Sequence, residues 1–357
     1  SHVQQHSRVR DQMTRMPHIV TSLIFVIAIT AGLGMQETAA PPGEALVTAA
    51  IAFKDTLKPE QVKVAVLAYD DERRVDWHFI PKAQRKGLMV RSMTKPQKTA
   101  AGAVLKAGLS VLGHRKVRQI MALEAVLQDL EKDNPGKFAR DTLRYYYTIF
   151  GDPGEKGTWG LSIEGHHLSL NFVVKDSKVV SSTPQVLCAN PTVVKADVGK
   201  IKAGTRVLKN EEVFAFELVN MLDADQALIA IVDEKAPREV RSAGAAQVPL
   251  GKPIGIAWTD LNDVQRKLLR KIVRVYAATM APTIMQERLS DIAEGKWNNV
   301  HFAWAGATKP GVGHYYRIQG PTFEIEFVNT QPDAAGNPAS HIHCMWRDVR
   351  GDFAISR

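Results

Sequence analysis

The chain has 357 residues, of which 45% are hydrophobic and 23% are charged, and its formal net charge is +9. This composition is typical of a globular protein and excludes a largely disordered chain or a multi-span membrane protein. The excess positive charge favours weak attraction to polyanions. No basic run with interleaved aromatic residues occurs, so we expect no nucleic-acid partner.

The first forty residues differ from the rest of the chain. Arg8, Arg10 and Arg15 precede an apolar stretch over residues 19–33, and small residues follow at 38–40. This pattern is typical of a secretory signal peptide, and the stretch is short for a membrane span. An uncleaved anchor and a buried helix are the alternatives. We expect residues 1–40 to be a signal peptide with upstream residues, and the mature protein to be exported (periplasmic or extracellular) without membrane association.

The remaining residues, 41–357, predict one domain that contains both helices and strands. Segments with helical patterns lie at about 45–57, 95–131 (broken near Gly113), 139–150, 211–233 and 262–295. Strand patterns lie at about 77–80, 161–173 and 178–189, the last two joined through Asp176 and Ser177, and in the last sixty residues. This order predicts an α+β fold, with an antiparallel sheet and helices packed on it.

Three predicted helices begin with the same local signal. A capping residue is followed three positions later by glutamine in Thr94-x-x-Gln97, Asp223-x-x-Gln226 and Asn262-x-x-Gln265. In a capping box the first side chain accepts a bond from the third helical amide, and the glutamine reaches back to the capping amide. The recurrence also hints at a weak internal repeat.

Strand alternation selects a first set of candidate histidines. Along 161–173, His167 faces the polar side, whereas His166 faces the apolar side and is expected to be a core or supporting residue. In the C-terminal strand His341 and His343 share a face and stand about 6.5–7 Å apart along the backbone. That spacing suits two imidazoles that converge on one ion.

A third ligand would complete this site. We expect His167 to be that ligand and His314 to be the second choice, while Cys344 faces away from His341 and His343. Three histidines with one open position are the arrangement that catalytic zinc uses. Imidazole suits several transition metals, and we expect a divalent ion, zinc or copper.

The segment 314–329 predicts a hairpin with polar side chains. If Gly320 and Pro321 form a two-residue turn, Arg317 faces Glu324 and Tyr315 faces Glu326. One interpretation is a charged outer face stabilised by a cross-strand pair. The other is a cleft wall in which Glu326 or Glu324 is a general base and Tyr315 or Arg317 steers the substrate.

The two cysteines, Cys188 and Cys344, leave a disulfide, two free thiols or a metal-ligating thiol open. The sequence contains no G-x-S-x-G, H-E-x-x-H, Walker or Rossmann motif. The familiar hydrolase, protease and nucleotide-binding signatures therefore do not assign a reaction.

Four segments together resemble an uncharacterised, mostly bacterial family that is catalogued as a domain of unknown function and often follows a signal peptide. They are Glu164–Asn171 (EGHHLSLN), His314–Pro321 (HYYRIQGP), Asn329–Gln331 (NTQ) and His341–Asp348 (HIHCMWRD). The resemblance runs from about Trp77 onward. It implies no activity, but it directs attention to the histidines in these motifs.

The sequence therefore predicts an exported metal-binding protein. We expect a metalloenzyme that performs hydrolytic or Lewis-acid chemistry on a small-molecule substrate at a three-histidine site, although whether it is an enzyme stays open. The alternative is a non-catalytic exported protein that binds a small ligand.

Overall fold

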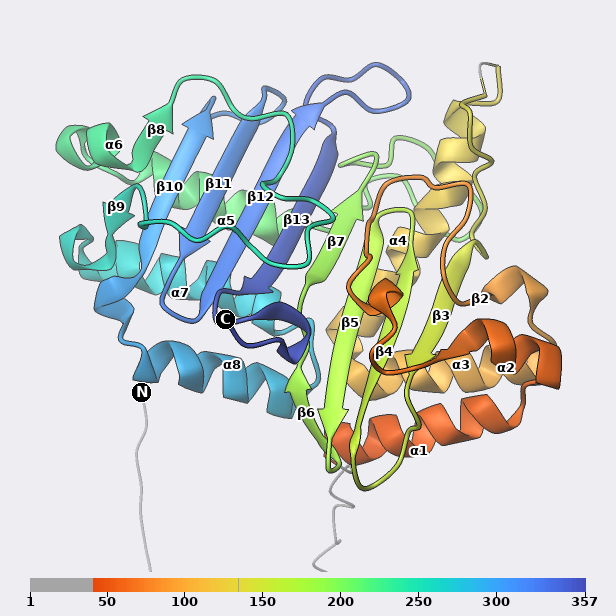
Figure 1. Ribbon diagram of the computed structural model, residues 1–357. Coiled ribbons are helices and arrows are strands. Elements are labelled where there is room, and N and C mark those ends of the chain that lie inside the picture. Colours follow the sequence, from red (N-terminus) through yellow and green to blue (C-terminus); the bar gives the residue numbers. More distant parts are fainter. Residues whose placement is uncertain (1–40, 134) are drawn as a thin grey trace, which may run out of the picture. The chain divides into compact units, whose positions relative to one another are not determined.

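The computed structural model of the protein describes residues 41–133 and 135–357 (Figure 1). The predicted signal peptide lies outside these residues. Within them, no helix combines the length and the apolar character that crossing a membrane requires.

The described residues form an α+β fold, as the sequence predicts. The helices are α1 (Pro42–Asp55), α2 (Pro59–Ala65), α3 (Lys95–Gly108), α4 (Val111–Leu130), α5 (Lys209–Asn220), α6 (Ala224–Ala230), α7 (Asp263–Ala277) and α8 (Pro282–Glu294). The strands are β1 (Val66–Leu67), β2 (Leu88–Met89), β3 (Tyr145–Phe150), β4 (Thr158–Gly165), β5 (Leu168–Lys175), β6 (Lys178–Ser181), β7 (Gln185–Ala189), β8 (Ile231–Asp233), β9 (Ile256–Ala257), β10 (His301–Gly306), β11 (His314–Gln319), β12 (Phe323–Gln331) and β13 (His341–Asp348). All strands belong to one mostly antiparallel sheet.

The strands of the sheet are connected in the same way from either edge to the centre. Its path is β1-β3-β4-β5-β7-β13-β12-β11-β10-β8, with β7 and β13 side by side at the centre (Figure 1). β1 and β8 run parallel to their neighbours, β2 and β9 pair antiparallel with the same neighbours, and two helices precede β1 as two precede β8. The topology is therefore that of two similar units related by an approximate twofold axis between β7 and β13.

The helix starts carry the same repeat at the level of hydrogen bonds. All three predicted capping boxes are present, at Thr94, Asp223 and Asn262. In the first unit, the amide Nε2 of Gln97 donates to Gln61 Oε1 at 2.7 Å. In the second, Nε2 of Gln265 donates to Gln226 Oε1 at 2.6 Å. The weak repeat that the sequence suggests is thus an architectural repeat.

The two faces of the sheet are covered differently. Apolar side chains of the helices pack on one face, where they meet Phe327, Ile342 and Cys344 in the main core. The other face is covered by irregular segments, 68–87 and 234–255, which place Trp77, Phe79 and Val240 against a smaller core. The candidate site lies on this second face.

Three local predictions are wrong. The predicted helix over 139–150 is instead β3, whose six residues are all buried, because an aromatic and β-branched run favours a strand inside a sheet. The predicted strand at 77–80 is irregular. The predicted strand over 161–173 is a hairpin, β4 and β5, that turns at His166 and His167.

Candidate metal centre

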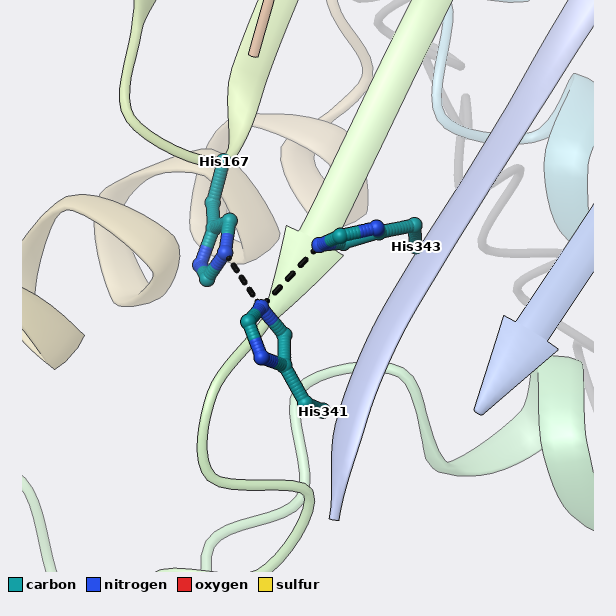
Figure 2. A group of neighbouring side chains, drawn as sticks. All are labelled: His167, His341 and His343. Atoms are coloured by element: carbon teal, nitrogen blue, oxygen red, sulfur yellow. Dashed lines mark hydrogen bonds between the residues drawn. The ribbon is translucent and has the colours of Figure 1, made fainter. Parts of the chain in front are cut away.

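Three histidines from two distant parts of the chain converge on one point (Figure 2). His167 comes from the turn between β4 and β5, while His341 and His343 come from the start of β13. Their potential ligand atoms lie within 4.8 Å of one another. The three residues that the sequence predicted as a group therefore do lie together.

The contacts between these rings are made by Nε2 atoms. Nε2 of His341 lies 2.8 Å from Nε2 of His167 and 3.0 Å from Nε2 of His343. Two nitrogens of a tetrahedral zinc site, each about 2.0–2.1 Å from the ion, are about 3.3 Å apart. If these nitrogens moved apart by a few tenths of an ångström, an ion would fit among the three atoms.

The backbone around His167 fixes the direction of its ring. His167 has a φ of 64°, in the left-handed region that few non-glycine residues adopt. Its amide donates to Phe79 O at 2.7 Å, and its carbonyl accepts from Cys188 N at 2.9 Å. The turn is thus held to a covering segment on one side and to β7 on the other.

Polar partners hold the other two imidazoles from behind. Nδ1 of His343 lies 2.9 and 2.8 Å from the two carboxylate oxygens of Glu239, so it carries the proton and donates it to them. Nδ1 of His341 lies 3.3 Å from Asn190 Nδ2, and the amide of His341 donates to Asn329 Oδ1 at 2.9 Å. A carboxylate that accepts from Nδ1 leaves the Nε2 lone pair free and more basic, as in many metal sites.

Burial keeps two of the three histidines neutral. Desolvation, reinforced by the neighbouring histidines, lowers the pKa of His167 well below its usual range and lowers the pKa of His341 to about 2. Both rings therefore keep a lone pair near neutral pH. A buried cluster of neutral imidazoles is suited to a cation and poorly suited to a bound proton.

His166 stands directly behind this group. Its ring centroid is 3.7 Å from that of His167, and its Nδ1 is 2.5 Å from Glu124 Oε1 and 3.2 Å from Arg140 Nη1. His166 lies in the turn and not on a strand, so of the two roles predicted for it, core or supporting residue, the supporting one fits. It supports His167 and is not one of the three converging residues.

His314, the second choice for the third ligand, does not join the cluster. It is fully buried on the helix-covered face, where its ring lies against Phe216 and Trp304 and its Nε2 is 3.2 Å from Glu212 Oε1. A β-strand directs alternate side chains to opposite faces. The strand itself therefore separates His314 from the metal centre.

The β11–β12 hairpin has a register different from the predicted one. Gly320 N bonds to Phe323 O, so the two-residue turn consists of Pro321 and Thr322, one position later than predicted. Arg317 consequently faces Glu326, and Glu324 faces Gln319. Because the register moved by two positions, the predicted side chains remain on the face that carries His343.

Around Glu326 the structure forms a buried polar group. Tyr315 Oη donates to Glu326 Oε1 at 2.5 Å, and the amide of Arg241 lies 3.2 Å from both carboxylate oxygens. The Arg241 side chain pairs with Glu324. Burial, followed by the charge of Glu324, raises the pKa of Glu326 to about 7. This group contacts none of the three histidines, and its proposed catalytic role stays a prediction.

The cysteines lie on opposite faces of the sheet. Cys188 is the register partner of His343, while Cys344 points into the main core and its thiol approaches Leu187 O. Both are free and buried. Cys344 therefore faces away from the metal centre, as alternation predicts.

The sequence of this chain was also compared with known proteins. A family described as "Protein of unknown function (DUF3500)" matches residues 39–355. The chain belongs to the DUF3500 family. No curated protein and no solved structure matches it. Membership of DUF3500 thus confirms the resemblance seen in the sequence and leaves the function to be argued from the site.

Sequence reasoning missed the residues that support the ligands in this DUF3500 protein. Glu239 lies in the irregular segment 234–255, where no periodicity indicates a direction for any side chain. Asn190 follows β7 and gave no signal either. Asn329 was visible as part of the Asn-Thr-Gln motif, but its bond to the backbone of His341 depends on the strand pairing.

Proposed function

We propose that this DUF3500 protein is an exported metalloprotein in which Nε2 atoms of His167, His341 and His343 bind one divalent ion, zinc or copper. The observation that carries the proposal is the convergence of these three nitrogens from a pinned turn and a strand. The carboxylate of Glu239 behind His343 and the low pKa of His341 support it. These features suit a metal ion, which needs deprotonated imidazole nitrogens. A purely structural histidine cluster has no such need.

An enzymatic role is the finer part of the proposal. Three protein ligands leave a position for a small-molecule substrate, at which a metal can act as a Lewis acid or promote hydrolysis. Glu326 is our candidate general base, because a pKa near 7 permits proton exchange at neutral pH. Tyr315 and Arg317 adjoin it and would steer the substrate.

The alternative is a non-catalytic protein that binds a small polar ligand on the same face. Arg317 favours it: the side chain is 6% exposed, yet its Nε has no partner among the described residues. A buried guanidinium N–H without a partner is costly, and the positive charge suits an anionic ligand. Ligand binding without turnover and without metal would favour this alternative.

Elemental analysis of the purified protein tests the metal proposal. Near-stoichiometric zinc or copper is expected in the wild type and little in the His341→Ala/His343→Ala variant. His301→Ala, a change in a half-buried histidine outside the group, is the matched control and should retain the metal. Thermal unfolding of each metal-free protein checks that the variants fold. Wild-type protein that takes up no metal after reconstitution would rule the proposal out.

Export rests on the sequence pattern of residues 1–40 and on no structural observation. It predicts that the protein recovered from outside the cytoplasm begins near residue 41. Intact protein that stays in the cytoplasmic fraction would refute it. This result is independent of the metal measurement.

A further inference from the structure

A cavity of about 640 Å³ lies next to the metal centre but outside it. Its walls come from α5, from the segment 192–206 and from the end of the β12–β13 loop. Ser340 in its wall directly precedes His341, but none of the three metal-centre histidines lines it. The volume is in the range of pockets that hold small organic molecules.

The body of this cavity is apolar. Val193, Val213, Phe216 and Pro338 contribute side chains to its walls. Val213 is only half-buried, and Phe216 is held from behind by the rings of Trp304 and His314. Such a surface favours a hydrocarbon or aromatic group over a fully polar ligand.

One guanidinium gives the cavity a polar end. Arg206 pairs through Nη2 with Glu212 Oε2 at 2.5 Å, and its side chain remains 26% exposed; its Nε is buried and has no partner among residues 41–133 and 135–357. Arginine has five donors, and its fork suits a carboxylate. Arg206 thus has donors to spare.

The carboxylate of Glu212 does not cancel this preference. It also accepts from Asn329 Nδ2 at 2.9 Å and lies 3.2 Å from Nε2 of His314, so both of its oxygens have polar neighbours within the wall. These contacts help to lower the pKa of Glu212 against the opposing effect of burial. The other charges, Lys195 and Glu217, are opposite in sign and exposed at the rim, where water screens them.

We propose that this cavity binds an amphipathic carboxylic acid, with its apolar body against Val213 and Phe216 and its carboxylate on Arg206. The site is distinct from the metal centre and does not depend on a bound metal. The ligand class follows from an apolar wall that ends at a guanidinium with unused donors. A neutral molecule of the same shape would lose the charge-assisted bonds.

The test is calorimetric titration of the full chain with 4-phenylbutyrate and with the uncharged 4-phenylbutan-1-ol. We expect the acid to bind about tenfold more tightly than the alcohol, as for one charge-assisted contact. Arg206→Gln should reduce this preference to about twofold or less. Arg206→Lys, which keeps the charge and can still pair with Glu212, should give an intermediate value. Lys202→Gln, on an exposed side chain outside the cavity, should match the wild type.

A second variant tests the location. Val213→Phe adds bulk to the cavity wall and should weaken both probes without lowering the melting temperature much, because Val213 is half-buried. Equal binding of acid and alcohol to the wild type would overturn the ligand class. Undiminished binding to Val213→Phe would overturn the location, and no binding at millimolar probe would overturn the proposal as a whole. The His341→Ala/His343→Ala variant should bind the acid like the wild type, which separates this site from the metal centre.

Discussion

Glu239→Gln tests the proposed metal centre without changing any of the three histidines. In the wild type, both carboxylate oxygens of Glu239 lie within 2.9 Å of His343 Nδ1. Glutamine keeps the shape but removes the charge, and it can present its NH₂ group to a nitrogen that also carries a proton. The imidazole then loses the partner that fixes its proton on Nδ1.

The expected effect is on metal affinity. Loss of such a supporting partner costs about tenfold to a hundredfold in affinity, or about 1.4–2.7 kcal/mol. The Glu239 side chain is one-third exposed, so its direct Coulomb attraction to the ion is partly screened. Most of the loss should therefore come from the orientation and basicity of His343.

Competition with a chromophoric chelator measures the zinc affinity of each protein. Glu234→Gln is the matched control, because Glu234 is exposed on the same covering segment and its substitution removes the same charge. It should change the affinity by less than about twofold. The metal-free variants should unfold at nearly the wild-type temperature. Equal affinities for Glu239→Gln and Glu234→Gln would refute the supporting role of Glu239.

Three further outcomes are expected for the metal-free protein. Because the pKa of His341 is about 2 in the folded protein, this histidine takes up a proton below about pH 6.5 only when the protein is unfolded. The free energy of unfolding therefore falls by up to about 1.4 kcal/mol for each pH unit of acidification. In urea unfolding, His341→Gln should reduce this slope. The pKa of Glu326 is raised from 4.5 to about 7, so its contribution has the opposite sign, and the wild type loses stability as the pH rises through this window. Between pH 4.5 and 8, the free energy of unfolding of Glu326→Gln should rise by up to about 3 kcal/mol relative to that of the wild type. A difference between the two proteins that does not change with pH would contradict the raised pKa. Gln97→Ala and Gln265→Ala should each destabilise by about 1–3 kcal/mol in chemical unfolding, because they occupy matching buried positions, whereas the exposed Val264→Ala should cost less than about 0.5 kcal/mol.

The sequence predicts that the three histidines come together because alternation along a strand is a strong geometric rule. His341 and His343 needed only a strand to share a face. The choice of His167 over His166 was correct for a different reason from the one used, since both lie in a turn and the positive φ of His167 helps to direct its ring. The predicted role of His167 thus depended on residue type and on its place in the chain more than on strand periodicity.

The supporting residues could not be predicted because they depend on contacts distant in sequence. Glu239 contacts His343 from a segment that Arg241, two residues later, attaches to Glu324 and Glu326. Nothing in the local sequence of this irregular segment sets that distance. The register of the β11–β12 hairpin was missed for a smaller reason, since the two-residue turn lies at Pro321 and Thr322, and this displacement by one residue shifts the pairing by two positions.

The architectural repeat explains why the metal centre draws on both halves of the chain. β7 and β13 meet at the approximate twofold axis, so the turn before β5 in the first unit lies near the start of β13 in the second. In the second unit, the turn corresponding to that of His166 and His167 contains Pro321 and Thr322, neither of which has an imidazole. The two units are therefore alike in pairing and capping but not in chemistry. The three-histidine group therefore has no counterpart at the matching turn of the second unit, and the proposed metal centre requires that both units fold and that β7 pairs with β13.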